Sequence, residues 1–438
     1  MQKNKLDYII TVFFLLICAK STFIYYSDVA WFIFTVVTLA IGLIQKRIYE
    51  NDIYIFLGFL GTYFLYILFR YVFLNKLSND YLISDIFFVF KYILLAYAYV
   101  VVMKERIAEV FPQVIAFWSL ITLGFYAFQL AGGGKVLFVF GTTIQGMLPP
   151  MPTLSETYSN FILFSYDTIH HVRNSGFAWE PGAFGCFLVI GMIIHFINNN
   201  YKFDSIAIIM TIAILSTLST TTYVGFSIIM YLYYRMNGGK VHLGFILFLG
   251  IGLIAFFTLP FLGEKIISTY NEDVKMLDDY EELSWELDYY TEIGGEVMLN
   301  RFSSWIFLYR HFGWQLIFGV SNAYVNITSS IYGIPINRFN ISNGIIDFIT
   351  KFGLIGFCYV NFRIGKFIYM HTKSLEISFL TVVSIVLLNF GEPIFILPIT
   401  MMFIFFPNLI ILVDKDEEKD HDDYNATERE SADELLGD

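Results

Sequence analysis

An arginine, two histidines and a glutamate lie close together in the segment 170–182, which reads HHVRNSGFAWEPG. An apolar stretch begins directly after it, so these side chains stand at the predicted surface of a membrane, where unneeded charge is costly. Arg173 has the forked guanidinium that binds phosphate, and His171 or Glu180 could serve as a general base. The alternative interpretation of Glu180 is structural, because an acid beside Pro181 is typical of a helix start.

A second group of polar residues lies in the segment 301–320, RFSSWIFLYRHFGWQLIFGV. Its apolar residues recur at helical spacing between charged ones, which predicts an interfacial helix that is too polar to span a membrane. Arg301 and Arg310 are separated by two and a half helical turns, so we expect one to point inward and the other outward. Both, together with His311, are candidates for phosphate recognition, and contact with lipid headgroups is the alternative.

A third group precedes the apolar stretch that follows residue 343. Ser342 or Asn343 could cap a helix there, and Asn343 is equally a candidate substrate contact. Three further polar residues, Asp85, Lys91 and Glu392, lie within or beside apolar stretches. Lys91 is expected to face the interior and to pair with a carboxylate, which is either Asp85 or an acid on another helix.

Several catalytic signatures are absent from the sequence. It contains no Walker A, GxSxG or HExxH motif, and no cysteine and histidine cluster that would bind a metal. The pairs Asp278-Asp279 and Glu281-Glu282 could bind a hard cation, but in so acidic a segment simple solvation is favoured. The sequence therefore predicts no metal and no cofactor.

The composition requires a membrane to position these groups. Of 438 residues, 57% are hydrophobic and only 15% are charged, whereas a soluble domain has about 25% charged residues. This composition excludes a soluble enzyme and a disordered chain. The net charge of −11 comes from two acidic segments, 263–300 and 414–438, and the remainder is net basic. The segment 414–438 is predicted to be a disordered acidic tail.

Apolar stretches recur along residues 1–413, which predicts one all-α polytopic membrane domain. About twelve spans are predicted, at 7–26, 29–44, 53–74, 82–103, 111–131, 182–197, 204–218, 222–236, 241–262, 344–370, 375–390 and 393–413. The first is interpreted as an uncleaved span, since no clean signal-peptidase site follows it. The basic residues of the short loops fall on one side, which predicts cytoplasmic termini and two large outer loops, roughly 132–181 and 263–343.

Four motifs in this order resemble those of a known family. They are RNSGFAWEPGAFG (173–185), LSTLSTTTYVGF (215–226), FGV (318–320) and SNGIIDFITKFGLIG (342–356). Together with the spans and the two outer loops, they resemble the bacterial O-antigen and capsular polysaccharide polymerases of the Wzy type, within the superfamily that includes the O-antigen ligases. The stretch from Arg173 to Gly182 is the most specific part of the likeness.

The resemblance implies a GT-C-like, metal-independent glycosyltransferase of the inner membrane that works at its periplasmic face. Its substrate, as donor and acceptor, would be an oligosaccharide repeat unit on undecaprenyl diphosphate. Arg173 and Arg301 would stabilise the diphosphate leaving group, and Glu180 or His171 would be the base. Arg310, His311 and Asn343 are expected to contact substrate. A chain-length regulator is a further candidate partner besides the lipid bilayer, and no nucleic acid is expected.

Two alternatives to a polymerase are an O-antigen ligase-type transferase and a lipid-linked oligosaccharide flippase. Ligases of the superfamily carry a histidine where this chain has Ser342, and tend to carry an arginine in the motif that matches Ser219 to Tyr223, which here has none. Both departures favour the polymerase over the ligase. A flippase would place its charges along a central cavity and keep its outer loops short, which is the opposite of the predicted pattern.

Overall fold

The computed structural model describes residues 4–74, 79–149, 158–169, 171–238, 270–272, 274–275, 277–279, 297–328 and 335–410. These residues are predominantly helical, in agreement with the predicted all-α class, and their β-structure is two short two-stranded sheets and one isolated bridge. The predicted ninth span at 241–262, the pair Glu281-Glu282, His170 and the tail 414–438 lie outside the described residues.

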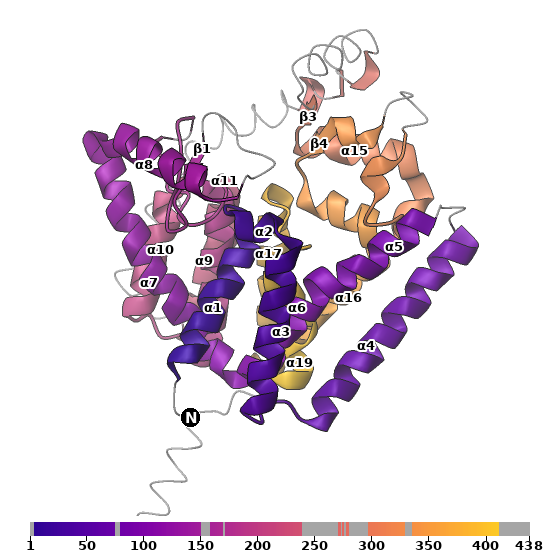
Figure 1. The fold of residues 1–438 in the computed structure, drawn as a ribbon, viewed down its shortest axis with the longest axis horizontal. Coiled ribbons are helices and arrows are strands. Elements are labelled where there is room, and N and C mark those ends of the chain that lie inside the picture. The colour runs from indigo at the N-terminus through magenta and orange to yellow at the C-terminus, as the bar shows by residue number, and fades with distance from the viewer. Residues whose placement is uncertain are drawn as a thin grey trace, which may run out of the picture.

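The first half of the chain forms helices, several of which run between the end of the molecule that carries the N-terminus and the opposite end (Figure 1). They are α1 Lys5–Cys18, α2 Phe23–Tyr26, α3 Asp28–Ile44, α4 Glu50–Phe69, α5 Asn79–Phe88, α6 Leu94–Met103, α7 Ile107–Phe128 and α8 Gly134–Met147. Short π-helical or 3-10 turns join several of them, at Arg70–Leu74, Val89–Ile93, Lys104–Arg106 and Gln129–Gly133.

The second half adds helices α9 Pro181–Asn198, α10 Ser205–Ser216, α11 Thr220–Met236, α15 Arg301–Phe312, α16 Gly344–Thr372, α17 Leu375–Gly391, α18 Pro398–Met401 and α19 Phe406–Leu409. Short 3-10 segments lie at Gly313–Ile317, Tyr324–Asn326, Ile336–Arg338 and Met402–Ile404. Strand β1 (Tyr158–Asn160) pairs antiparallel with β2 (Ser165–Asp167), and β3 (Val297–Leu299) pairs parallel with β4 (Phe339–Ile341).

Many of the helices begin where a small polar side chain accepts a hydrogen bond from the first turn. Such a side chain satisfies a backbone N–H group that has no partner within the helix. The capping residues of this kind are Asn4, Ser27, Asp204, Asn300, Asn343 and Ser374. The start of each of these helices is therefore encoded locally.

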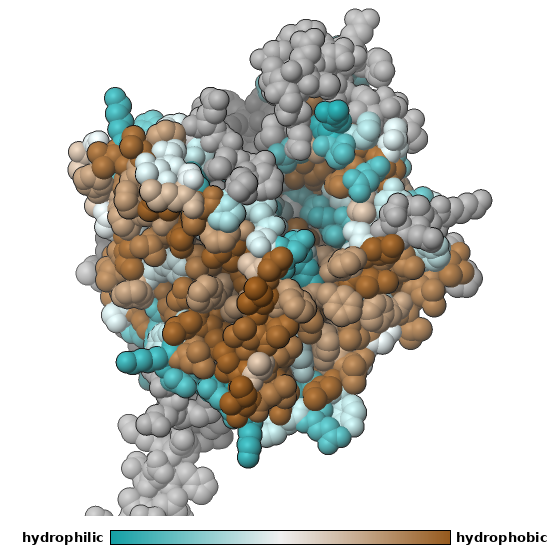
Figure 2. Space-filling view, in the orientation of Figure 1, coloured by the Kyte–Doolittle hydropathy of each residue, from teal (hydrophilic) through white to brown (hydrophobic). Residues whose placement is uncertain are grey.

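Four helical stretches among the described residues are long and apolar enough to cross a membrane: Glu50–Val72, Tyr81–Met147, Pro181–Asn198 and Gly344–Thr372. The second of these has 67 residues and comprises several successive helices from α5 to α8. Three shorter apolar helices are α3, α10 and α17. In Figure 2 hydrophobic residues cover most of the visible body, and hydrophilic residues gather toward its two ends. These features support a helical membrane protein, and the number of spans remains a prediction.

The predicted final span at 393–413 is wrong as a continuous helix. The described part of this segment forms three short helical pieces, α18, the 3-10 turn Met402–Ile404, and α19. Pro398 and Pro407 lie in the first turns of α18 and α19, where a proline without an N–H group is tolerated. The pieces are almost wholly buried among other helices, which is where non-helical backbone at membrane depth is tolerated.

The two segments predicted as outer loops contain ordered structure with small apolar cores of their own. One core joins α8 to the β1–β2 hairpin through Leu137, Phe161, Phe164 and Tyr166. The other joins β3, β4, α15 and the start of α16, and includes Phe307, Leu308 and Phe339. Both parts lie at the end of the molecule opposite to its N-terminus, α8 and β1 to the left and α15 to the right in Figure 1. The predicted interfacial helix is shorter than expected, since α15 ends at Phe312 and a 3-10 turn follows.

Candidate functional site

The segment that links β2 to α9 carries the first group of predicted site residues. The Asn174 side chain anchors it, because Nδ2 donates to Ser216 Oγ at 2.8 Å and Oδ1 accepts from Gly176 N at 2.9 Å. Arg173 is half-buried, and its Nε donates to the carbonyl oxygen of Thr217 at 3.0 Å. The segment thus holds Arg173 against the connection between α10 and α11.

Glu180 directly precedes α9, and Pro181 occupies the first turn of that helix, as predicted. The Glu180 carboxylate forms no capping hydrogen bond with the N–H groups of α9, and it accepts a hydrogen bond from Trp179 Nε1 at 2.7 Å. It also forms a side-chain hydrogen bond with Glu392, the residue directly after α17. The side chain of Glu180 therefore does not act as a helix cap, and its partners are the side chains of Trp179 and Glu392.

Arg301 reaches the same turn from another direction. It is the first residue of α15, and its Nη2 donates a long hydrogen bond of 3.4 Å to the carbonyl oxygen of Gly391. Arg301 also interacts electrostatically with Glu392. Glu180 and Arg301, which the sequence placed in separate outer loops, therefore meet at the Gly391–Glu392 turn.

Asn343 contributes to the position of Arg301. Its Oδ1 accepts from Ile345 N and Ile346 N at the start of α16, and its Nδ2 donates to the Arg301 carbonyl oxygen at 3.0 Å. The side chain is fully buried. Of its two predicted roles, this geometry favours the helix cap, with the added function of tying α15 to α16.

The ends of several helices pack closely around this turn. A Cβ atom on Gly344 would lie 2.7 Å from the Glu392 carbonyl oxygen, and one on Gly182 would lie 3.0 Å from Glu392 Cδ. A Cβ atom on Gly391 would lie 2.6 Å from Thr221 Oγ1 in the first turn of α11. Arg173 contacts the connection that leads into this same turn of α11, through the carbonyl oxygen of Thr217.

Lys20 and Glu392 belong to this group, although neither was predicted as a site residue. Lys20 follows α1, and its Nζ lies 5.2 Å from the ring centroid of Trp179 and 5.7 Å from that of Tyr25. It also interacts electrostatically with Glu392. Lys20 lies toward the outer end of the first predicted span, whereas lysines usually gather on the cytoplasmic side of a membrane protein. This unusual position was the feature of the sequence that could have identified Lys20.

Glu392 is 3% exposed, whereas Glu180, Arg301 and Lys20 are all half-buried. Burial raises the pKa of the Glu392 carboxyl well above its usual range, contact with Glu180 raises it further, and Arg301 and Lys20 act in the opposite direction. The site thus combines two carboxyl groups with two cations, a set that can accept a proton and stabilise an anion.

The remaining predicted residues lie elsewhere. The His171 side chain is exposed, with its Nδ1 3.3 Å from the Thr168 carbonyl oxygen. Arg310 forms an ion pair of 2.7 Å with Asp278, and both side chains are largely exposed. His311 packs edge-on against Phe312, and burial lowers its pKa. Arg301 and Arg310 therefore point to different surroundings, as predicted from their spacing.

The structure corrects the predicted pairing of Asp85 with Lys91. Lys91 pairs with Asp28 of α3 at 2.6 Å, which is the predicted alternative of an acid on another helix. Asp85 pairs with Arg70 at 2.7 Å, and both side chains are buried. Asp85 lies in α5 and Lys91 lies in the π-helical turn that follows it, and the two residues have separate partners.

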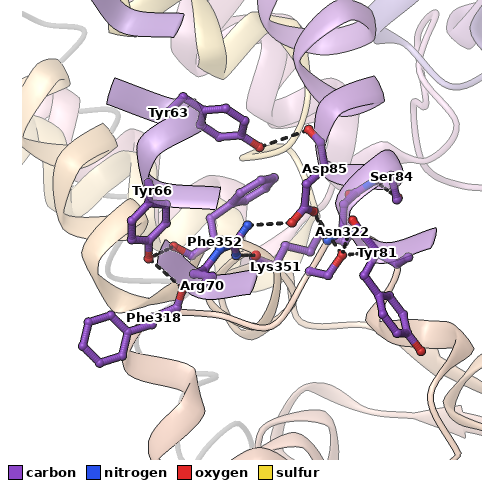
Figure 3. A network of polar contacts seen from close by, with 12 residues as sticks. Tyr63, Tyr66, Arg70, Tyr81, Ser84, Asp85, Phe318, Asn322, Lys351 and Phe352 are labelled. Carbon is purple, nitrogen blue, oxygen red and sulfur yellow. Dashed lines mark hydrogen bonds and ion pairs between the residues drawn. The ribbon is translucent and has the colours of Figure 1, made fainter. Parts of the chain in front are cut away.

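Figure 3 shows the buried polar network that surrounds the ion pair of Arg70 and Asp85. Arg70 Nη1 donates to the Lys351 carbonyl oxygen at 2.6 Å, and Asp85 Oδ1 accepts from Asn322 N at 2.6 Å. Tyr66 Oη donates to the Phe318 carbonyl oxygen at 2.6 Å. The network ties α4 and α5 to α16 and to the segment after α15, so it supports the part of the fold that carries Arg301.

Among the described residues, no three histidine, cysteine, aspartate or glutamate side chains are grouped as a metal site requires. Comparison with known proteins adds no relative: no protein-family model, no curated protein and no solved structure matches the chain.

Proposed function

We propose that this chain is a membrane glycosyltransferase that polymerises oligosaccharide repeat units carried on undecaprenyl diphosphate, yielding O-antigen or capsular polysaccharide. The observation that carries the proposal is the meeting of Glu180 and Arg301 at the Gly391–Glu392 turn. A proton acceptor and a forked cation are the two groups that glycosyl transfer from a diphosphate requires. Both are half-buried, so a substrate can reach them while the surrounding protein reduces solvation by water.

The proposed reaction joins two repeat units in one step. The acceptor hydroxyl oxygen attacks the anomeric carbon of the donor sugar, and its proton passes to the Glu180 carboxylate. The bond between the anomeric carbon and the diphosphate oxygen breaks, and its electron pair stays with the diphosphate. Arg301 and Arg173 stabilise the negative charge that develops there, so the proposed transfer needs no metal.

An apolar groove supports a lipid-linked substrate. It has a volume of about 400 Å³ and lies between α4 and α16, lined by residues such as Thr62, Tyr63, Phe348, Phe352 and Ile355. Phe348 is one helical turn from Gly344, which packs on the carbonyl oxygen of Glu392. The groove thus begins close to the site along α16, and in this proposal it holds part of the polyprenyl chain.

The finer architecture is part of the same proposal: about twelve spans, a GT-C-like arrangement, cytoplasmic termini and a periplasmic site in the bacterial inner membrane. Support comes from basic residues at the end of the molecule where α1 begins. Arg47 and Arg106 pair with Asp7 of α1, and Lys104 pairs with Asp52 of α4. This basic end lies opposite to the end that carries α8, β1 and α15, which fits the positive-inside rule with the site outside.

The test is reconstitution of the purified full chain in liposomes with an undecaprenyl-diphosphate repeat unit, followed by separation of the products on a gel. A ladder of regularly spaced products is the expected result. A single transfer to an added lipid A acceptor would instead identify a ligase. Movement of the substrate across the bilayer without any new glycosidic bond would identify a flippase and overturn the proposal.

A further inference from the structure

Glu392 is a buried acid for which the reaction above has no role. It lies between α17 and α18 and contacts Glu180, the residue before α9, and its Cδ would be 3.0 Å from a Cβ atom on Gly182. The nearest turn of α9 therefore leaves space for this carboxyl only because residue 182 is glycine. Such close accommodation indicates that the carboxyl has a defined position.

The hydrogen bond between Glu180 and Glu392 requires a proton. Two ionised carboxylates only accept hydrogen bonds, so a bond between two carboxyl groups forms when one of them is protonated. Glu180 already accepts a bond from Trp179 Nε1. Within the described part of the chain, Glu392 Oε2 is buried and has no hydrogen-bond partner. Glu392 is thus the member of the pair that is better placed to carry the proton.

The charged and titratable groups that face Glu392 come from several elements. They are Glu180 and Cys186 at α9, Arg301 at α15, and Lys20 after α1. Two of these are cations, yet burial and the neighbouring acid outweigh them, and the pKa of Glu392 lies well above its usual range. The electrostatic balance therefore agrees with the geometry that assigns the proton to Glu392.

We propose that Glu392 is a positioning residue that shares a proton with Glu180 and, together with Trp179, holds the Glu180 carboxylate in the orientation that receives the acceptor proton. The shared proton rests on the contact with Glu180, on the burial of Glu392 and on its unpartnered Oε2, whereas its catalytic consequence rests on the proposed function. The acceptor class is a hydroxyl of a sugar, and the shared proton is not consumed in the transfer.

Substitution of Glu392 separates this role from simple packing. In Glu392→Gln the amide N–H group can donate to Glu180 as the carboxylic acid does, so polymerisation near neutral pH should stay close to that of the wild type. Glu392→Leu removes the donor, and loss of orientation should lower turnover about 100-fold. Glu376→Gln is the matched control, since Glu376 is an exposed acid at the other end of α17.

The pH profile is the readout that packing alone would not change. When the pH rises through the raised pKa of Glu392, ionisation places two negative carboxylates together, and wild-type activity should fall on the alkaline side. Glu392→Gln cannot ionise and should lose this alkaline fall, whereas Glu376→Gln should keep it. A Glu392→Gln enzyme with the wild-type pH profile would overturn the catalytic part of the proposal.

Infrared difference spectroscopy on the full chain tests the shared proton without any activity. The wild type and Glu376→Gln should show the carbonyl stretch of a protonated carboxylic acid near neutral pH, and Glu392→Gln should lose it. An unchanged band in Glu392→Gln would show that Glu392 does not carry the proton. If the infrared band behaves as expected but no ladder of products forms, the proposed function fails and the shared proton stands. If the ladder forms but the band is absent, the proposed function stands and the shared proton fails.

Discussion

The backbones of Gly319 and Gly353 are in direct contact, and each occupies the space that a side chain on the other residue would need. A Cβ atom on Gly353 would be 2.6 Å from Gly319 N, and one on Gly319 would be 2.7 Å from the Phe352 carbonyl carbon. Both residues have positive φ angles, +74° and +73°, and Gly353 marks a kink inside α16. This contact joins the segment after α15 to α16, and a hydrogen bond of 2.7 Å from Val320 N to the Thr350 carbonyl oxygen lies beside it.

Gly353→Ala should therefore destabilise the fold around α15. Gly353 has a φ of 73° and a ψ of 168°, a conformation that essentially only glycine adopts and that costs another residue about 1–3 kcal/mol. Overpacking against the Gly319 backbone adds about 1–3 kcal/mol. We expect a lower midpoint of thermal unfolding in detergent and faster proteolysis between residues 297 and 328. The matched control is Gly124→Ala in α7, where a Cβ would meet no atom within 4 Å. Equal stability of the two variants would contradict the structural role of the glycine pair.

Arg301→Ala should lower polymer synthesis about 100-fold, which is the typical loss when one donor to a developing negative charge is removed. Arg301→Lys keeps the charge but loses the forked geometry, so its activity should lie between those of the wild type and the alanine variant. The measurement is the initial rate of product formation in liposomes.

The control for this prediction is Arg338→Ala, because Arg338 is an exposed arginine in the same segment, 263–343, which is predicted to be an outer loop. Its rate should match that of the wild type. A comparable loss in both variants would mean that the positive charge of this surface matters, rather than the position of Arg301.

Glu180→Gln should reduce turnover by about 100-fold or more if Glu180 is the general base, because the amide cannot accept the proton. His171→Ala should have little effect, since the His171 side chain is exposed and lies apart from the described contacts of Arg301 and Glu392. Single-turnover rates of the two variants at several pH values will show whether Glu180 or His171 is the general base. A large loss in His171→Ala with near-normal Glu180→Gln would move the base to the histidine.

Thr62→Trp should weaken use of the lipid-linked substrate. Thr62 lies on the exposed face of α4 and lines the groove between α4 and α16, so an indole there can fill the groove without disturbing the packed core. We expect a higher KM for the undecaprenyl-diphosphate substrate with a smaller change in kcat. Leu65→Trp is the control, because Leu65 is 69% exposed on the same helix and does not line the groove. Equal KM values would argue against a lipid chain in this groove.

Local patterns were sufficient to predict many of the helices. The stretch predicted at 29–44 is α3 (Asp28–Ile44), and that predicted at 182–197 is α9 (Pro181–Asn198). Each is a continuous apolar run next to a polar boundary, so its limits depend on neighbouring residues only. The prediction of one helix for 393–413 failed because two prolines and burial inside the protein favour short pieces, and hydropathy does not distinguish burial in protein from burial in lipid.

The candidate site was predicted in part. Arg173, Glu180 and Arg301 were found from their residue types beside apolar stretches, whereas Lys20 was missed and Glu392 was noted only as a buried acid. The cap role of Asn343 was predicted, because a cap depends on the next few residues, but its bond to the Arg301 carbonyl oxygen was not. That bond joins the starts of two helices whose relative position no local pattern specifies.

Composition and continuous apolar runs by themselves indicated a helical membrane protein, and they placed most of its described helices, because transfer into an apolar environment and helix capping are properties of neighbouring residues. Only the tertiary structure decided that Glu180 meets Glu392 and that Arg301 reaches Gly391. These contacts arise where the ends of α9, α15 and α17 pack together, and helix packing depends on the complementary shapes of surfaces that are distant in the sequence.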